Sequence, residues 1–164
     1  MTKVFKELSI KDIGDILYFV SDNLQENSSY TNGISPFLTM QSLKALLEQK
    51  ILSIAGSYEN ERLTGITILM YSNCISKDTS ITLIYTTIDV DLLNFALQKC
   101  NTNCFNKQYS KVKVYVNEQQ KTQILQNFLN ACNFVYELTF DLQNGRFWDV
   151  YSYFYIEEHV GGKK

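Results

Sequence analysis

The chain has 164 residues, of which 45% are hydrophobic and 20% charged, and its formal net charge is −2 at pH 7. A chain of this length buries a core without disulfides or metals to staple it, and the composition is that of an ordinary globular domain. The only arginines are Arg62 and Arg146, and a slightly negative chain does not attract nucleic acid. We therefore expect one domain over residues 1–158, a C-terminal tail over 159–164 and no nucleic-acid partner.

Membrane and metal sites are not predicted either. No apolar run approaches the roughly 20 residues of a membrane span, and the N-terminal residues lack the apolar core of a signal peptide. Cys74, Cys100, Cys104 and Cys132 form no CxxC pair, and the single histidine, His159, lies in the tail. Thiols in this arrangement are typical of small buried hydrophobes in a reducing compartment. These patterns favour a cytoplasmic protein without a metal.

The first half of the chain predicts strands and two short helices. Val4–Leu8 is expected to be a strand, and Ser9 with Asp12 predicts the capped start of a helix. Residues 21–35 are rich in Asn and Ser and are expected to form a loop. A second helix should begin at Thr39, and residues 51–58 and 63–71 should form a hairpin.

The second half alternates strands and helices. The expected elements are a strand over residues 80–88, an amphipathic helix over 91–103, a strand over 111–116, a helix over 120–131 and a hairpin turning at Asn144-Gly145. Two helices covering the sheet should bury Leu92, Leu93, Ala96, Leu97, Ile124, Leu125 and Phe128. Tyr151, Tyr153 and Tyr155 alternate on one strand face, where packing against the sheet is the default and a partner-binding surface is the alternative. This order predicts an α/β protein with one mixed sheet, in which 80–88 runs parallel to 111–116.

The element order resembles the GCN5-related N-acetyltransferase (GNAT) fold from end to end. Smaller signals agree: Leu63-Thr-Gly65-Ile is similar to the start of that family's third strand, and Asn133-Phe134 stands where its fourth helix usually ends in Gly-Phe. Asn tolerates the left-handed conformation needed there. The resemblance implies an acyl-CoA N-acyltransferase fold, with acetyl-CoA as co-substrate and an amine as acceptor. The oligomeric state stays open, with a homodimer as one option.

Two departures concern the cofactor and the chemistry. The family's glycine-rich pyrophosphate loop is absent, because the strand runs through Ile84–Ile88 directly into Asp89 and Asp91. These carboxylates suit helix capping and repel a phosphate. The tyrosine that the family often uses as general acid would fall at Leu129, which cannot transfer protons. The catalytic residues are therefore left unassigned.

The resemblance also implies a site where the family's fourth and fifth strands splay apart and expose backbone groups to the pantetheine arm. The corresponding positions are Tyr85, Thr86, Thr87, Ile88 and Asn117. The alternatives are that the threonines are ordinary strand residues and that Asn117 caps a helix with Gln120. Glu118 and Asp89 are candidate bases, or else simple helix-dipole partners.

Two function hypotheses follow. The first is an N-acetyltransferase that moves an acetyl or acyl group from acyl-CoA to an amine. The second is a module that has the same fold but lacks catalysis and binds a protein or small ligand. An unrelated α+β domain is the third and weakest alternative.

Overall fold

The computed structural model describes residues 2–23, 29–31, 39–71, 80–103, 111–142 and 146–155. Within these ranges no helix is both long and apolar enough to cross a membrane. The elements, in chain order, are β1 (Val4–Leu8), the short 3-10 helix η1 (Ile10–Asp12), α1 (Ile13–Asn23), β2 (Ser29–Thr31), α2 (Met40–Glu48), β3 (Leu52–Glu59), β4 (Arg62–Tyr71), β5 (Ser80–Thr87), α3 (Val90–Asn103), β6 (Lys111–Asn117), the 3-10 helix η3 (Glu118–Gln120), α4 (Gln123–Ala131), β7 (Val135–Leu142) and β8 (Arg146–Phe154).

One mixed sheet organises the fold. Its strand order is β1-β3-β4-β5-β6-β8-β7, with β2 added beside β5. The pair β5–β6 is parallel, and the adjoining pairs β4–β5 and β6–β8 are antiparallel. This confirms the predicted parallel strand–helix–strand unit inside a mixed sheet, with hairpins on both sides.

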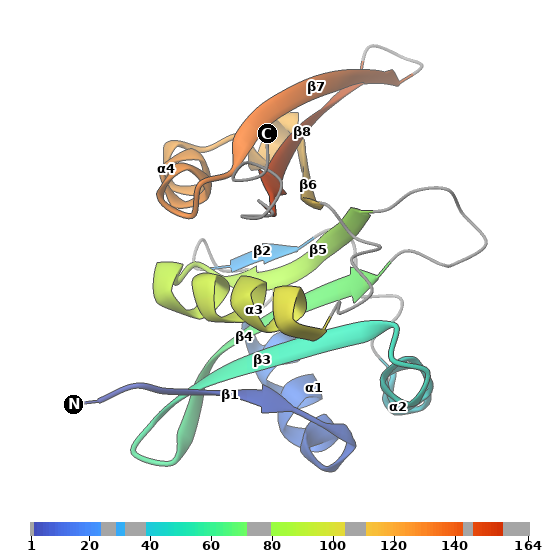
Figure 1. The fold of residues 1–164 in the computed structure, drawn as a ribbon, viewed down its shortest axis with the longest axis vertical. Coiled ribbons are helices and arrows are strands. Elements are labelled where there is room, and N and C mark those ends of the chain that lie inside the picture. The colour runs from blue at the N-terminus through green and yellow to red at the C-terminus, as the bar shows by residue number, and fades with distance from the viewer. Residues whose placement is uncertain are drawn as a thin grey trace, which may run out of the picture.

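Helices cover the sheet in two groups, each with its own core (Figure 1). The α1 and α2 side chains pack with apolar residues of β3 and β4, including Ile16, Leu43 and Ile68. In the other core, α3 lies against β3 and β4, and its Leu92 shares one cluster with Phe128 of α4 and with residues of β5 and β6. Gly65 in β4 permits the close approach of α3, because a Cβ there would lie 2.7 Å from Ser57 Oγ and 3.0 Å from Leu92 Cδ2.

The predicted burial of helix residues is confirmed with one exception. Six of the seven predicted core residues on α3 and α4 are buried, whereas Ile124 is 54% exposed. The side chains of α4 that face the core are Leu125, Phe128, Leu129 and Cys132, at the i, i+3, i+4, i+7 spacing of one helix face. Ile124 lies about 100° away from Leu125 around the helix, at the edge of this face, and is therefore half exposed.

Several local predictions about helix ends are confirmed. Thr39 caps α2, since its Oγ1 accepts a 3.1 Å hydrogen bond from Ser42 N. Ser9 N donates to Asp12 Oδ2 at the start of η1. Asn133, which follows α4, has φ of 66°, the left-handed conformation expected of it. Tyr151, Tyr153 and Tyr155 pack against the α3–α4 core, which confirms the default interpretation.

Two predicted boundaries are wrong. Residues 29–31 lie within the expected loop 21–35, yet they form β2. The expected helix over 120–131 is divided, because η3 ends at Gln120 and α4 begins at Gln123 with Thr122 as its cap. The expected turn at Asn144-Gly145, the tail with His159, and the thiols of Cys74 and Cys104 lie outside the described residues.

Candidate functional site

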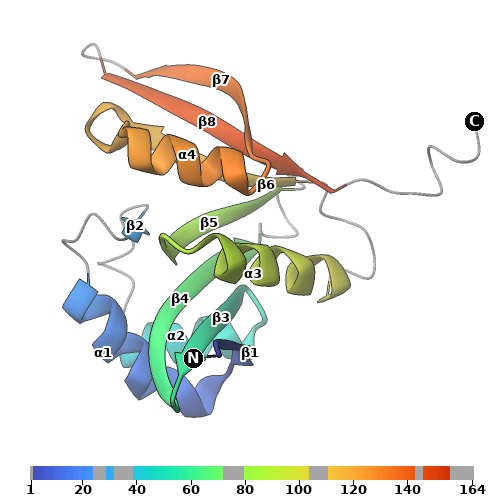
Figure 2. The same cartoon turned by 90° about the vertical axis from the view of Figure 1, so that its left-hand side faces the viewer.

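The site is built by the separation of two parallel strands. β5 pairs with β6 only from Ser80 to Thr82, opposite residues 111–113. A β-bulge at Ile84 interrupts the pairing of β5 with β4, because Leu69 lies opposite Leu83 and Ile68 opposite Tyr85. A bulge bends and twists its strand. Beyond it, β5 leaves β6, and we call the space between residues 83–87 of β5 and 114–117 of β6 the wedge (Figure 2).

Strand β2 lies in the wedge. It pairs antiparallel with β5, with Ser29 opposite Thr87, Tyr30 opposite Thr86 and Thr31 opposite Tyr85. Figures 1 and 2 both place β2 beside the end of β5. The backbone of β5 that the sequence assigned to pantetheine binding is therefore paired with another segment of the same chain.

Tyr30 crosses the wedge from β2 to β6. Its ring is buried in the α3–α4 core with 3% exposure, and its hydroxyl donates a 2.6 Å hydrogen bond to the carbonyl oxygen of Tyr115. Burial raises the pKa of this phenol. Tyr30 is thus a neutral side chain that joins both walls.

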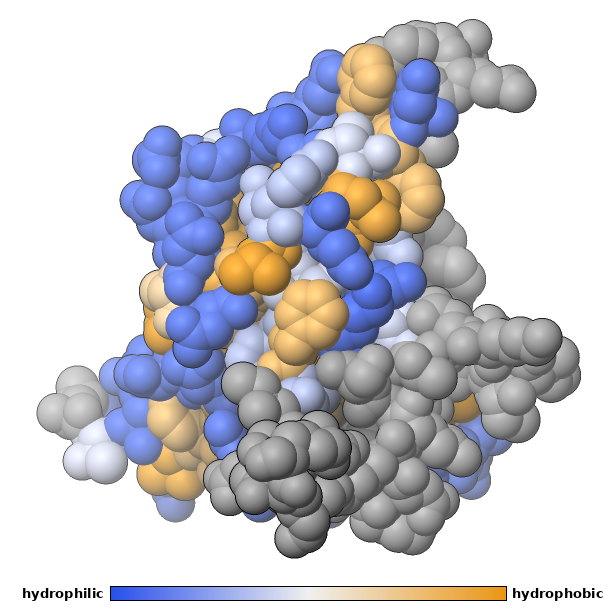
Figure 3. All heavy atoms as spheres, turned by 45° about the horizontal axis from the view of Figure 1, so that its top comes forward, coloured by the Kyte–Doolittle hydropathy of each residue, from blue (hydrophilic) through white to orange (hydrophobic). Residues whose placement is uncertain are grey.

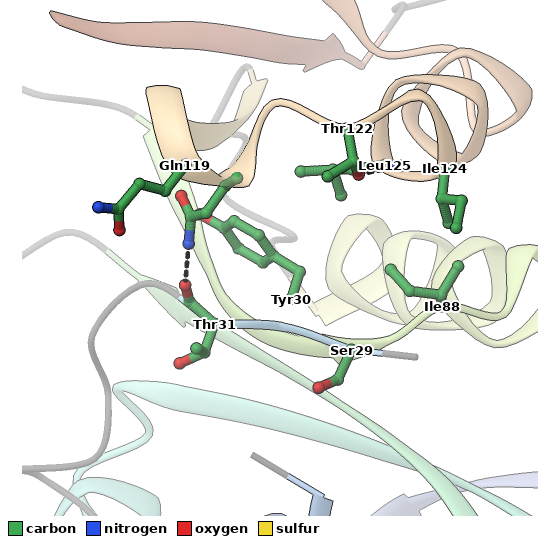
Figure 4. Close-up of a pocket in the computed structure, with 9 residues that line it drawn as sticks. Ser29, Tyr30, Thr31, Ile88, Gln119, Thr122, Ile124 and Leu125 are labelled. Carbon is green, nitrogen blue, oxygen red and sulfur yellow. Dashed lines mark hydrogen bonds between the residues drawn. The ribbon is translucent and has the colours of Figure 1, made fainter. Parts of the chain in front are cut away.

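Gln120, just after the end of β6, makes a second contact with β2. Asn117 Oδ1 accepts a 2.9 Å bond from Gln120 N, and Gln120 Oε1 accepts a 3.0 Å bond from Asn117 N, which is a capping box. The other end of the Gln120 amide donates 2.8 Å to the Thr31 carbonyl (Figure 4). The capping role considered for Asn117 is confirmed, and its effect here is to orient Gln120 toward β2.

A small pocket opens beside Tyr30, between β2 and the starts of α3 and α4. Its volume is about 270 Å³, and its lining carries no charged side chain. Ile88 points toward Ile124 across it, Leu125 and Thr122 line the α4 side, and β2 forms the opposite wall (Figure 4). The volume is slightly below the range of about 300–1,000 Å³ usual for small-molecule sites. Ile88 is the one predicted site residue that lines this pocket.

The N-terminus of α3 next to the pocket carries a carboxylate. Asp89 Oδ1 accepts hydrogen bonds from Asp91 N at 3.1 Å and Leu92 N at 3.2 Å, so the predicted cap is confirmed. Asp89 Oδ2 lies 2.8 Å from Lys3 Nζ. The hydrogen bond and negative charge of Asp89 raise the pKa of Lys3. This arrangement fills the positive end of the helix and leaves Asp89 little freedom to act as a base.

The hydroxyls of the two predicted threonines are used within the sheet. Thr86 Oγ1 lies 2.7 Å from Thr67 Oγ1, and Thr87 Oγ1 accepts a 3.1 Å bond from Ile66 N. Leu129, at the position where the resemblance implies a tyrosine, is fully buried. The side chains of Thr86 and Thr87 are therefore engaged within the sheet, and β2 pairs with the main chain of Tyr85, Thr86 and Thr87.

Sequence reasoning missed Tyr30, Thr31 and Gln120 as parts of the site. Tyr30 and Thr31 are residue types that favour strands. The strand is only three residues long and lies in a segment rich in Asn and Ser, so the sequence shows no hydrophobic alternation there. Gln120 was identified only as a capping partner, and its contact with Thr31 spans 89 positions of sequence. Lys3 was missed for the same reason, since it meets Asp89 across 86 positions.

Other reactive groups do not add to this site. Cys132 is buried beneath α3, and burial raises the pKa of its thiol to about 12, so it stays protonated. Among the described residues, no group of three potential ligands is placed to hold a metal. Phe140 on β7 and Phe147 on β8 are exposed. On the face that Figure 3 shows, hydrophobic residues lie among hydrophilic ones.

Comparison with solved structures identifies the fold. An acetyltransferase of the GNAT family from Streptococcus pneumoniae superposes with a TM-score of 0.67 at 12% identity, over 93% of this chain and 99% of its own. A Salmonella typhimurium protein solved with its cofactor acetyl-CoA gives 0.70 at 9% identity, over 96% of both chains. The spermidine/spermine N-acetyltransferase of Vibrio cholerae gives 0.60 at 16% identity, over 93% and 95%.

These likenesses extend over nearly the whole chain and define its class. The protein has the GNAT acyl-CoA N-acyltransferase fold, as the element order predicted. No family model matches the sequence, and the search of curated proteins gave no match. Identities this low show the fold alone, and the activity is a matter of proposal.

Proposed function

We propose that the protein is an N-acyltransferase that passes an acetyl or other short acyl group from acyl-CoA to an amine. The observation that carries the proposal is the wedge, where β5 separates from β6 after Thr82, in a fold shared with a protein solved with acetyl-CoA. The proposed donor contacts are the backbone of Tyr85, Thr86, Thr87 and Ile88, with Asn117 on the facing strand.

An acyl-CoA supplies a thioester whose carbonyl carbon is attacked by the amine, so that a C–N bond forms, the C–S bond breaks, and the amine proton leaves as the thiolate takes one up. Main-chain N–H groups of β5 are suited to polarise a carbonyl placed in the wedge. The apolar walls formed by Ile88, Ile124 and Leu125 would exclude water from this position. No side chain is assigned as acid or base.

The fit of an acyl-CoA is uneven along its length. The extended pantetheine arm carries amide groups, so it can form hydrogen bonds with the main chain of β5 as a neighbouring strand does. The diphosphate end fits poorly, because Asp89 already accepts the free N–H groups of α3. We therefore expect weak binding, with the arm held better than the phosphates.

The acceptor is proposed to be a small-molecule or peptide amine. The Vibrio cholerae neighbour acts on the polyamines spermidine and spermine, which are amines of this class. We propose a cytoplasmic location on the basis of the reduced, buried thiols of Cys100 and Cys132. A homodimer remains a prediction for measurement by light scattering.

Titration of acetyl-CoA into the pure protein by calorimetry tests the proposal. Saturable binding, followed by loss of the thioester when amines such as spermidine are added, is the expected result. The proposal would be contradicted if the protein bound neither acetyl-CoA nor S-acetylpantetheine.

A second candidate is a non-catalytic binding module with the same fold. Two observations favour it: Tyr30 fills the wedge, and Asp89 occupies the start of α3. It predicts no thioester turnover at any amine concentration, and it becomes the better description if the donor titrations above are negative.

A further inference from the structure

The main-chain edge of β5 already has an occupant, and this sets a condition on donor binding. We propose that β2 is an internal competitor of the acyl donor, held in the wedge by Tyr30, and that the donor binds only when β2 leaves. The inference rests on the proposed function, because it concerns the same wedge.

The first argument is that β2 and an acyl-pantetheine arm would use the same atoms. An extended arm pairing with Tyr85–Thr87 needs the N–H and C=O groups that lie toward β6. These face β2, which pairs with all three residues. A single edge has one set of such groups, so the two occupants exclude each other.

The second argument is that Tyr30 fills the remaining width of the wedge. Its ring lies in the α3–α4 core, which also contains Val116 of β6, and its hydroxyl donates to the Tyr115 carbonyl. A donor arm cannot pass between β5 and β6 while this side chain bridges them. Displacement of the Tyr30 side chain therefore opens the wedge even if part of the β2 backbone remains close to β5.

The third argument is that one side chain, Tyr30, provides the apolar burial of β2. This strand is three residues long, and Tyr30 is its one buried residue, because Ser29 and Thr31 are partly exposed. Gln120 Nε2 adds one bond to the Thr31 carbonyl. Since Tyr30 carries the apolar burial of β2, its truncation should raise the population of the open state, and apparent affinity rises with that population.

A reversible cross-link tests the competition directly. Ser29 and Thr87 are directly opposed, and opposed Cα atoms about 4.5–5.5 Å apart are within disulfide reach. The variant Ser29→Cys/Thr87→Cys is made with Cys74→Ser and Cys104→Ser, so that the remaining thiols are the buried Cys100 and Cys132. Oxidation should abolish binding of S-acetylpantetheine and acetyl-CoA in calorimetry, and reduction of the same sample should restore it.

Two substitutions of Tyr30 test the anchor. Tyr30→Phe removes only the hydrogen bond to Tyr115 and should tighten S-acetylpantetheine binding several-fold, whereas Tyr30→Ala should tighten it at least tenfold. Tyr18→Phe is the matched control, because Tyr18 is 76% exposed on α1, and it should change nothing. Thermal denaturation verifies that each variant is folded, and the cross-link provides the answer if Tyr30→Ala is not.

The outcomes separate the two proposals. Equal donor binding by the oxidised and reduced forms would overturn the competition and leave the acyltransferase proposal standing. Absence of binding by the reduced form, by Tyr30→Phe and by wild type would refute the proposed function, and the competition with it. Binding that depends on reduction and tightens in the order wild type, Tyr30→Phe, Tyr30→Ala supports both.

Discussion

The hydroxyl of Thr67 on β4 donates to the hydroxyl of Thr86 on β5, with their Oγ1 atoms 2.7 Å apart in the buried sheet. The direction follows from the second bond of Thr86, whose own proton goes to the Thr87 carbonyl 2.9 Å away. Both residues are fully buried. A residue that the sequence associated with donor binding thus uses its side chain to join two strands next to the wedge.

This pair predicts a non-additive effect on stability. Thr86→Val leaves the Thr67 hydroxyl buried without its acceptor and should cost about 1–3 kcal/mol. The double variant Thr67→Val/Thr86→Val removes both hydroxyls and should cost less than the sum of the two single changes. Urea denaturation of all four proteins measures this, with Thr86→Ser as the variant that retains the hydroxyl. A double variant that loses the full sum would show that the hydroxyls act independently.

The charge at the start of α3 predicts a response to substitution. Asp89→Asn retains a capping side chain but removes the partner of Lys3, so the helix end and a free ammonium would both face a phosphate. Asp89→Asn/Asp91→Asn should therefore bind acetyl-CoA more tightly than wild type, and more visibly at low salt. S-acetylpantetheine, which has no phosphate, is the matched ligand and should gain nothing. If the affinity for both ligands increased equally, the substitutions would not act through the phosphates of acetyl-CoA.

The burial pattern of α4 predicts a contrast between neighbouring positions. Leu125→Ala or Phe128→Ala should destabilise the fold by about 2–5 kcal/mol, because each leaves a cavity in the α3–α4 core. Ile124→Ala changes a side chain that is 54% exposed and should stay within about 0.5–1 kcal/mol. Denaturant midpoints compare the three. Similar losses at 124 and 125 would mean that the helix face is assigned wrongly.

A buried carboxylate predicts the behaviour at low pH. Burial raises the pKa of Asp149, but hydrogen bonds from Lys121 Nζ at 2.6 Å and Thr139 Oγ1 at 2.8 Å outweigh it, so the pKa lies below its ordinary value. A depressed pKa stabilises the fold above the unfolded value of about 3.9, and this contribution is lost as the pH falls through the folded value.

Asp149→Asn should therefore be less stable than wild type at pH 7, and the difference should shrink below about pH 4. Urea denaturation at pH 7 and pH 3 measures both. Asp141→Asn, which changes an exposed carboxylate on β7, is the matched control. A loss of the same size at both pH values would show that the charge of Asp149 does not matter.

The sequence predicts what depends on local pattern. The apolar stripe Leu92, Leu93, Ala96 and Leu97 locates α3 on its sheet, and the chain order of strands and helices gives the parallel pair β5–β6. Caps at Thr39 and Asp89 follow from residue type and spacing alone. The stripe and the caps involve residues a few positions apart, and the parallel pair follows from the strand–helix–strand order, so the sequence alone predicts all of them.

The site depends on contacts that no linear reading contains. Tyr30 meets Tyr115 across 85 positions, and Lys3 meets Asp89 across 86. A strand of three residues has no measurable period, and its partner strand can be assigned only when the separation of β5 and β6 is known. The wedge was therefore predictable by resemblance, whereas its occupant was not.

The edge presented by Tyr85, Thr86 and Thr87 consists of peptide groups, which every residue except proline provides in full. Alanine scanning across these positions would report on packing and leave the binding groups untouched. Backbone changes such as amide-to-ester replacement, or proline at one of these three positions, would remove a donor and expose their role. Side-chain substitutions around such an edge can therefore remove a recognisable sequence motif without removing the main-chain groups that bind.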